Sequence, residues 1–111
     1  MEYNWIKLPL YDSWDYEYKT TLINTPVTIR LYYSDRTEKW AFDIRDAEDE
    51  AIQEGEYIIP LNPTFRNVIE DKISFLWLEP VSDEINQTVL HPSQLRKYYN
   101  LYFIYRDVQA N

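Results

Sequence analysis

The sequence predicts an all-β fold: a small, single-domain antiparallel barrel or sandwich of about seven strands, with at most one short helical turn. Apolar and polar residues alternate along several segments, which is the pattern of half-buried strands. The chain also contains eleven Tyr, four Trp and four Phe, and such rings pack better on pleated strands than on helices. Polar turn-forming residues separate the alternating segments.

Length and composition predict one domain over residues 1–111, since compact domains usually have about 100–150 residues. With 45% hydrophobic residues the chain has enough material for a single core. No internal repeat, low-complexity segment or linker interrupts it.

The clearest element is an antiparallel hairpin formed by residues 27–33 and 39–46. The apolar positions that share a face are Val27, Ile29, Leu31 and Tyr33 in the first segment and Trp40, Phe42 and Ile44 in the second. Polar residues 34–38 form the turn between them. Residues 16–22 alternate in the same way, so we expect a three-stranded meander over residues 15–46.

Two shorter strands are predicted near prolines, which limit where a strand can pair. Residues 5–8 form a short first strand that Pro9 restricts to an edge or an end. Residues 57–59 form a short apolar strand that Pro60 closes.

The C-terminal half predicts one helical segment and two further strands. Residues 61–71 carry apolar side chains at spacings of three and four, which predicts one or two helical turns with Thr64 as N-cap. Residues 73–78 are apolar on both faces, which is typical of a buried strand. Residues 79–92 form a polar loop, and residues 99–105 form the last alternating strand.

Charge restricts the partners that the protein can have. The formal net charge is −8, which disfavours nucleic acids and anionic membranes and suits a basic partner surface. The N-terminus has no basic region followed by an apolar one, so no signal peptide is expected. No apolar run approaches the roughly 20 residues of a membrane span. We expect a soluble protein that stays where it is made or is built into an assembly.

No motif for catalysis or for cofactor binding is present. There is no cysteine, no glycine-rich phosphate loop and no nucleophile elbow. His91 has no partner at metal-ligand or catalytic spacing, so we expect an ordinary loop residue. Asp12, Asp15 and Glu17 could be combined for glycoside hydrolysis only at a carboxyl separation that sequence does not specify. We therefore expect a protein that is not an enzyme and holds no cofactor.

An acidic run is the best candidate for a calcium site. It comprises Asp43, Asp46, Glu48, Asp49, Glu50 and Glu54. The glycine that an EF-hand loop requires at its sixth position is absent. A solvated turn between two strands explains the run better, and we expect no bound metal.

Four aromatic residues near the N-terminus, Tyr3, Trp5, Tyr11 and Trp14, lie among polar neighbours. Tyr and Trp are enriched at protein interfaces. Two interpretations remain open. The rings either close one end of the fold as part of the core, or make residues 1–14 a docking arm that stacks on protein or on a sugar ring.

Three stretches resemble the baseplate plug proteins of contractile-tailed phages of the cyanophage type. They are the hairpin formed by residues 27–36 and 39–44, the acidic turn at 46–50 that leads to Gly55 and an apolar strand, and the tyrosine-containing final strand at 101–105. Their order, their spacing and the overall length carry the resemblance. A departure lies at residues 24–26, where the family usually has a glycine turn.

The resemblance implies a non-catalytic virion protein at the distal end of the tail. A plug subunit would contact baseplate hub and tail tube proteins and help to seal the channel until contraction. It would be assembled in the host cytoplasm, in several symmetric copies around the tail axis, with three as the plausible number. The alternative function is a carbohydrate-binding β module that uses Trp5 and Trp14. An OB-like nucleic-acid binder fits the strand number but conflicts with the charge.

Overall fold

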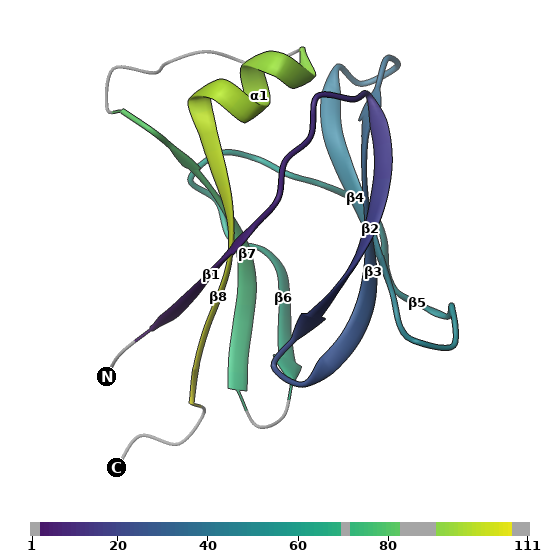
Figure 1. The fold of residues 1–111 in the computed structure, drawn as a ribbon, viewed down its shortest axis with the longest axis vertical. Coiled ribbons are helices and arrows are strands. Elements are labelled where there is room, and N and C mark those ends of the chain that lie inside the picture. The colour runs from purple at the N-terminus through teal and green to yellow at the C-terminus, as the bar shows by residue number, and fades with distance from the viewer. Residues whose placement is uncertain (1–2, 70–71, 83–90, 108–111) are drawn as a thin grey trace.

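Two antiparallel four-stranded sheets pack face to face in the computed structural model, which describes residues 3–69, 72–82 and 91–107 (Figure 1). The first sheet has the order β1-β8-β7-β6 and the second the order β2-β3-β4-β5. The strands are β1 Asn4–Leu8, β2 Asp15–Leu22, β3 Thr25–Ser34, β4 Lys39–Arg45, β5 Ala51–Tyr57, β6 Thr64–Ile69, β7 Lys72–Pro80 and β8 Tyr99–Asp107. Helix α1, Pro92–Tyr98, lies across one end of the sandwich (Figure 1).

The strand order is that of an up-and-down meander divided between two sheets. Strands β2 to β5 pair in sequence order, strands β6 to β8 do the same, and β1 joins the far side of β8. The chain crosses between the sheets through residues 9–14 and 58–63. Within the described residues no backbone ladder joins β1 to β2 or β5 to β6. The sheets therefore remain a sandwich, one of the two predicted architectures.

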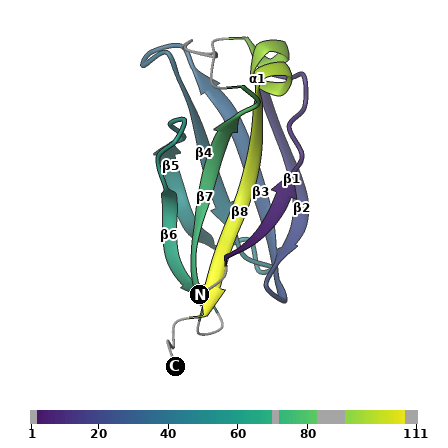
Figure 2. The same cartoon turned by 90° about the vertical axis from the view of Figure 1, so that its left-hand side faces the viewer.

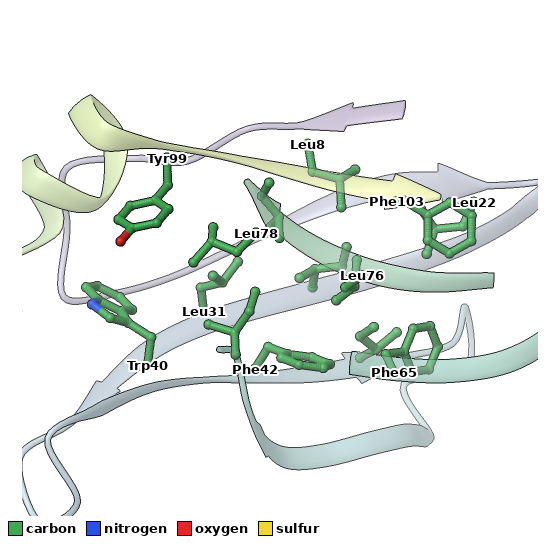
Figure 3. Packing of buried hydrophobic residues seen from close by; sticks show 14 of the residues in the cluster. Leu8, Leu22, Leu31, Trp40, Phe42, Phe65, Leu76, Leu78, Tyr99 and Phe103 are labelled. Carbon is green, nitrogen blue, oxygen red and sulfur yellow. The ribbon is translucent and has the colours of Figure 1, made fainter. Parts of the chain in front are cut away.

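The core fills the space between the sheets with side chains from alternate positions of the strands (Figure 3). Phe42 and Phe103, one from each sheet, are completely buried. The other residues that Figure 3 labels are Leu8, Leu22, Leu31, Trp40, Phe65, Leu76, Leu78 and Tyr99. Burial of so much apolar surface is the main favourable contribution to folding.

The predicted meander is confirmed. Antiparallel ladders join β2 to β3 and β3 to β4, and Tyr33 pairs with Trp40 beside the predicted turn. The predicted first strand is also confirmed, because among the described strands β1 lies at the edge of its sheet and pairs with β8 alone. The last predicted strand corresponds to β8, which pairs on both sides.

The predicted helical turns at residues 61–71 are wrong. Residues 64–69 form strand β6, which pairs with β7; residues 70 and 71 lie outside the described residues. A shift of register between Thr64 and Asn67 interrupts the ladder, and Phe65 has a φ of 51°. This irregularity buries the consecutive side chains of Thr64 and Phe65. As a result, the apolar residues of this segment do not alternate with polar ones, and their spacings of three and four resemble those of a helix.

The predicted strand at residues 57–59 is displaced in the structure. Strand β5 ends at Tyr57, and Ile58 and Ile59 belong to the crossing segment. As an edge strand with two shifts of register against β4, β5 is mostly exposed and shows no apolar alternation. Gly55 lies within it at a φ of 65°, a conformation that glycine adopts without strain.

The helix lies in a segment where no helix was expected. Residues 92–98 form α1, and residues 83–90 of the predicted polar loop lie outside the described residues. The predicted strand at 73–78 is confirmed as part of β7, but only one of its faces is fully buried. Leu76 and Leu78 point into the core, whereas Phe75 and Trp77 are half-buried on the opposite face.

Candidate interaction surface

The outer face of the first sheet carries a cluster of aromatic side chains. We call it the aromatic face and define it by Tyr3, Trp5, Phe75, Trp77, Tyr102 and Ile104. Figure 2 shows the strands that carry it side by side. Its members come together because Trp5 and Phe75 both pair with Ile104, and Trp77 pairs with Tyr102. Residues directly opposite each other on neighbouring strands share a face of the sheet.

Exposure differs sharply within the aromatic face. Tyr3 and Trp5 are 49% and 54% exposed, whereas Ile104, the cross-strand partner of Trp5, is 2% exposed. The rings thus cover an apolar floor while presenting their own surfaces to solvent. Large exposed aromatic side chains over a buried apolar base are typical of interaction sites.

The rings are held edge to face. Trp5 meets Tyr102 with ring centroids 5.2 Å apart and planes inclined by 78°. Tyr3 meets Phe75 at 6.2 Å, and Phe75 meets Trp77 at 6.3 Å, both also edge to face. Because these contacts restrict the side chains before any partner binds, binding costs less conformational entropy.

Polar groups border the aromatic face. The Arg106 Nε donates a hydrogen bond of 3.2 Å to the Tyr3 hydroxyl, and the guanidinium carbon lies 5.7 Å from the centre of the same ring. The Trp77 Nε1 donates to the carboxylate of Glu79. An apolar centre with a polar border is the usual composition of a protein interface.

The outer face of the second sheet is charged instead. Arg30 on β3 lies between Asp15 on β2 and Asp43 on β4, at N–O distances of 2.6 Å and 3.7 Å. Hydrogen bonds from Arg30 hold the pKa of the Asp15 carboxyl below its usual value. Asp43 also accepts hydrogen bonds from the Tyr32 hydroxyl, at 3.1 Å, and from the Gly55 N–H, at 2.7 Å.

A second ion-pair group continues along the same face. Arg45 contacts Glu17 and Asp49, each at 2.7 Å, and the hydrogen bond to Glu17 raises the pKa of the guanidinium. In the acidic turn, Asp46 Oδ1 accepts hydrogen bonds of 2.9 Å from the N–H groups of Glu48 and Glu50. These carboxylates therefore have structural partners within the fold.

The structure separates the four N-terminal aromatic residues into two groups. Tyr3 and Trp5 lie on the aromatic face, whereas Tyr11 and Trp14 belong to the crossing segment 9–14. Residues 4–8 form a paired strand, and residues 9–14 cross to the second sheet; residues 1 and 2 lie outside the described part.

Trp14 covers one end of the core. Its indole stacks on Trp40, with centroids 6.1 Å apart, and also contacts Tyr33 at 5.0 Å and His91 at 5.1 Å. The Tyr33 N–H donates a hydrogen bond of 2.9 Å to the Trp14 carbonyl. This arrangement fits the interpretation in which a ring closes the end of the fold.

Tyr11 packs beside the edge strand β2. Its ring meets those of Tyr16 and Tyr18 at 5.2 Å and 5.9 Å, and its N–H donates a hydrogen bond of 3.1 Å to the Tyr16 hydroxyl. Burial raises the pKa of both Tyr16 and Tyr18. The Tyr18 hydroxyl is buried without a hydrogen-bond partner among the described residues.

His91 has a local role that the sequence analysis missed. It is the N-cap of α1, and its Nδ1 accepts a hydrogen bond of 3.1 Å from the Ser93 N–H. The His91 N–H in turn donates to the Gln94 side chain at 3.4 Å. Pro92 at the first helical position, with Gln94 two residues later, was the signal that could have predicted this helix start.

Sequence reasoning also missed Phe75, Trp77 and Tyr102. The signal for Phe75 and Trp77 was the apolar character of both faces of residues 73–78, which by itself predicts complete burial. Among the residues that the structure describes, no three His, Cys, Asp or Glu side chains are placed to hold a metal ion. Within the described residues, no helix is long and apolar enough to span a bilayer.

One comparison with known proteins gives a match over most of the chain. A family model described as "Cyanophage baseplate Pam3 plug gp18" matches residues 5–107. The matched part runs from the first strand to the last and contains Trp5, Phe75, Trp77 and Tyr102 of the aromatic face. No curated protein matches the chain at a significant level.

Proposed function

The chain belongs to the cyanophage baseplate plug family, and from this premise we propose that it is a non-catalytic, single-domain plug subunit that closes the distal end of a contractile phage tail. Membership of the family establishes a structural role in the phage tail baseplate and association with other baseplate proteins. Closure of the tail, through contacts made by the aromatic face, is the further step that we propose.

The observation that carries the proposal is the contrast between the two outer faces. On the second sheet the arginines are paired within the fold, since Arg30 and Arg45 each contact two carboxylates. The first sheet instead leaves Tyr3 and Trp5 about half exposed over the buried Ile104. Covering these rings would remove apolar surface from water, and buried aromatic side chains contribute strongly to protein interfaces.

We propose that baseplate hub and tail tube proteins are the partners that cover the aromatic face. Several symmetric copies, with three as the plausible number, would surround the tail axis, because phage tails have rotational symmetry. Assembly in the host cytoplasm is part of the same proposal.

The experiment compares the incorporation of two variants into phage tails. Trp5→Glu places a charge on the aromatic face, and Thr21→Glu places the same charge on the exposed outer side of the edge strand β2. Tails are assembled with each variant, and mass spectrometry measures the plug relative to the tube protein. We expect Trp5→Glu to lower incorporation at least about ten-fold and Thr21→Glu to leave it unchanged.

Equal incorporation of wild type and Trp5→Glu would overturn the assignment of the aromatic face. Thermal unfolding of the free variants, followed by circular dichroism, checks that both remain folded. The 54% exposure of Trp5 also suits the stacking of a sugar ring. If the free wild-type chain bound glycans on an array, and Trp5→Glu abolished that binding without affecting incorporation, the carbohydrate-binding function would replace the proposed one.

A further inference from the structure

An open hollow of about 420 Å³ lies between the end of β1 and helix α1. Residues 7–10 form one side, and Arg96 with residues 99–101 forms the other. Three of the residues that line it, Leu8, Tyr99 and Leu101, are core residues with exposed fractions of 3% or less, so the hollow borders the core. The hollow is thus a surface depression that lies against the hydrophobic core.

The charged residues that line the hollow, Lys7 and Arg96, are both basic. Neither has an ion-pair partner among the described residues, unlike Arg30 and Arg45 on the opposite sheet. Arg96 lies in the last turn of α1, where a cation interacts favourably with the helix dipole. That explanation does not apply to Lys7, which lies on strand β1.

This concentration of positive charge is unusual in a chain whose formal net charge is −8. The hollow also adjoins the aromatic face, since Lys7 pairs with Tyr102, the neighbour of Trp5. A segment that crosses the aromatic face from Trp5 towards α1 would reach both cations. Charged groups at the border of an interface select partners and fix the direction in which they bind.

We propose that the hollow binds carboxylate side chains of an acidic peptide segment from the neighbouring baseplate subunit. This inference rests on the proposed function and names the chemistry of the partner at one end of the aromatic face. The Arg96 guanidinium can hold a carboxylate through two parallel hydrogen bonds, and the Lys7 ammonium adds a point charge. The two cations suit a short acidic segment better than a polyanion, which the rest of the acidic surface repels.

The first test measures binding of a defined peptide to the full chain by NMR. The probe is acetyl-Leu-Glu-Glu-Leu-amide, and its matched control is acetyl-Leu-Gln-Gln-Leu-amide. We expect the carboxylate peptide, but not the glutamine peptide, to shift the amide signals of Lys7, Leu8, Arg96 and Asn100. Equal shifts with the glutamine peptide, or tighter binding of inorganic phosphate or hexathymidylate than of the peptide, would overturn the proposal.

Charge-matched variants show whether the two cations are responsible. Lys7→Gln/Arg96→Gln should weaken binding of the carboxylate peptide at least ten-fold. Lys19→Gln/Arg36→Gln removes the same charge from exposed positions on β2 and in the turn between β3 and β4, and should leave the affinity unchanged. Equal weakening by both double variants would indicate a general effect of net charge and would contradict a specific site.

Incorporation into tails separates this inference from the function on which it rests. We expect Lys7→Gln/Arg96→Gln to reduce incorporation, and the reduction to diminish at high salt, where the charge interaction is screened. If Trp5→Glu blocks incorporation and the double glutamine variant incorporates normally, the hollow is not a partner site and the plug function stands. If both variants incorporate normally, neither the hollow nor the aromatic face binds the neighbouring subunit, and both assignments fail.

Discussion

The indole of Trp14 stacks on that of Trp40, with centroids 6.1 Å apart and planes inclined by 3°. Trp40 is 3% exposed, and Trp14 forms part of its cover at one end of the sandwich. Trp14 and Trp5 are similarly exposed, at 45% and 54%, but their contacts differ: Trp14 stacks on a buried core residue, whereas Trp5 lies on the aromatic face, which we propose a partner covers.

This difference predicts unequal effects of truncation on stability. Trp14→Ala should lower the free energy of unfolding by about 2 kcal/mol, because it removes ring contacts and exposes Trp40. Trp5→Ala should lower it by about 1 kcal/mol or less, the usual range for a cross-strand pair. Urea denaturation measures both, and a larger loss for Trp5→Ala would contradict the assignment.

Two neighbouring tyrosines on β2 predict opposite effects of removing a hydroxyl. The Tyr16 hydroxyl accepts a hydrogen bond from the Tyr11 N–H, whereas the Tyr18 hydroxyl is buried without a partner among the described residues. Tyr16→Phe should lower the free energy of unfolding by about 0.5–1 kcal/mol. Tyr18→Phe should leave it unchanged or raise it by up to about 1 kcal/mol, because an unsatisfied group is removed.

The raised pKa of Tyr18 adds a pH dependence to this comparison. Burial disfavours the phenolate, so the folded state holds its proton above the ordinary pKa of about 10. The contribution to stability is fully present below pH 10 and is lost as pH rises beyond it. The free energy of unfolding should thus fall less for Tyr18→Phe than for wild type between pH 9 and about 11. Urea denaturation measures this free energy at each pH. Equal losses in the two proteins would contradict this account.

The ion pair of Asp15 with Arg30 predicts a dependence on acid pH. Because Arg30 lowers the pKa of Asp15, the stabilisation is present above the unfolded value of about 3.9 and is lost as pH falls through the folded value. Asp15→Asn should cost less than about 1 kcal/mol at neutral pH, since the pair is solvent-exposed. The cost should disappear in strong acid or at high salt, and Asp12→Asn serves as the control.

The cap of α1 predicts that His91 is replaceable by another capping residue. His91→Ala should lower the free energy of unfolding by about 1 kcal/mol, because the Ser93 N–H loses its acceptor. His91→Asn should retain most of the stability, since asparagine is a good N-cap. Equal losses in the two variants would show that the ring contact with Trp14 matters more than the cap.

The sequence predicted the regular strands and failed where the backbone is irregular. Strands β3 and β4 pair without a shift of register, so their apolar side chains keep the two-residue period. Strands β5 and β6 contain shifts that remove this period. Helix α1 has only seven residues and begins at an uncommon histidine cap, which left no amphipathic pattern to recognise.

The candidate interaction surface was predicted in part for a similar reason. Tyr3 and Trp5 were identified because large aromatic residues stand out among the polar residues of the N-terminal segment. Phe75 and Tyr102 were missed because they join the surface only through the pairing of β1 with β8 and of β8 with β7. Alternation within one strand cannot show which distant strands will lie beside it.

Hydroxyl-radical footprinting of intact tails tests the central claim most directly, by comparing side-chain oxidation in the free chain and in the assembled baseplate. Trp5 and Tyr102 should be oxidised readily in the free chain and be protected in the tail. Trp14, at the end of the sandwich, provides the internal reference. Continued oxidation of Trp5 in the tail at the rate of the free chain would contradict the account.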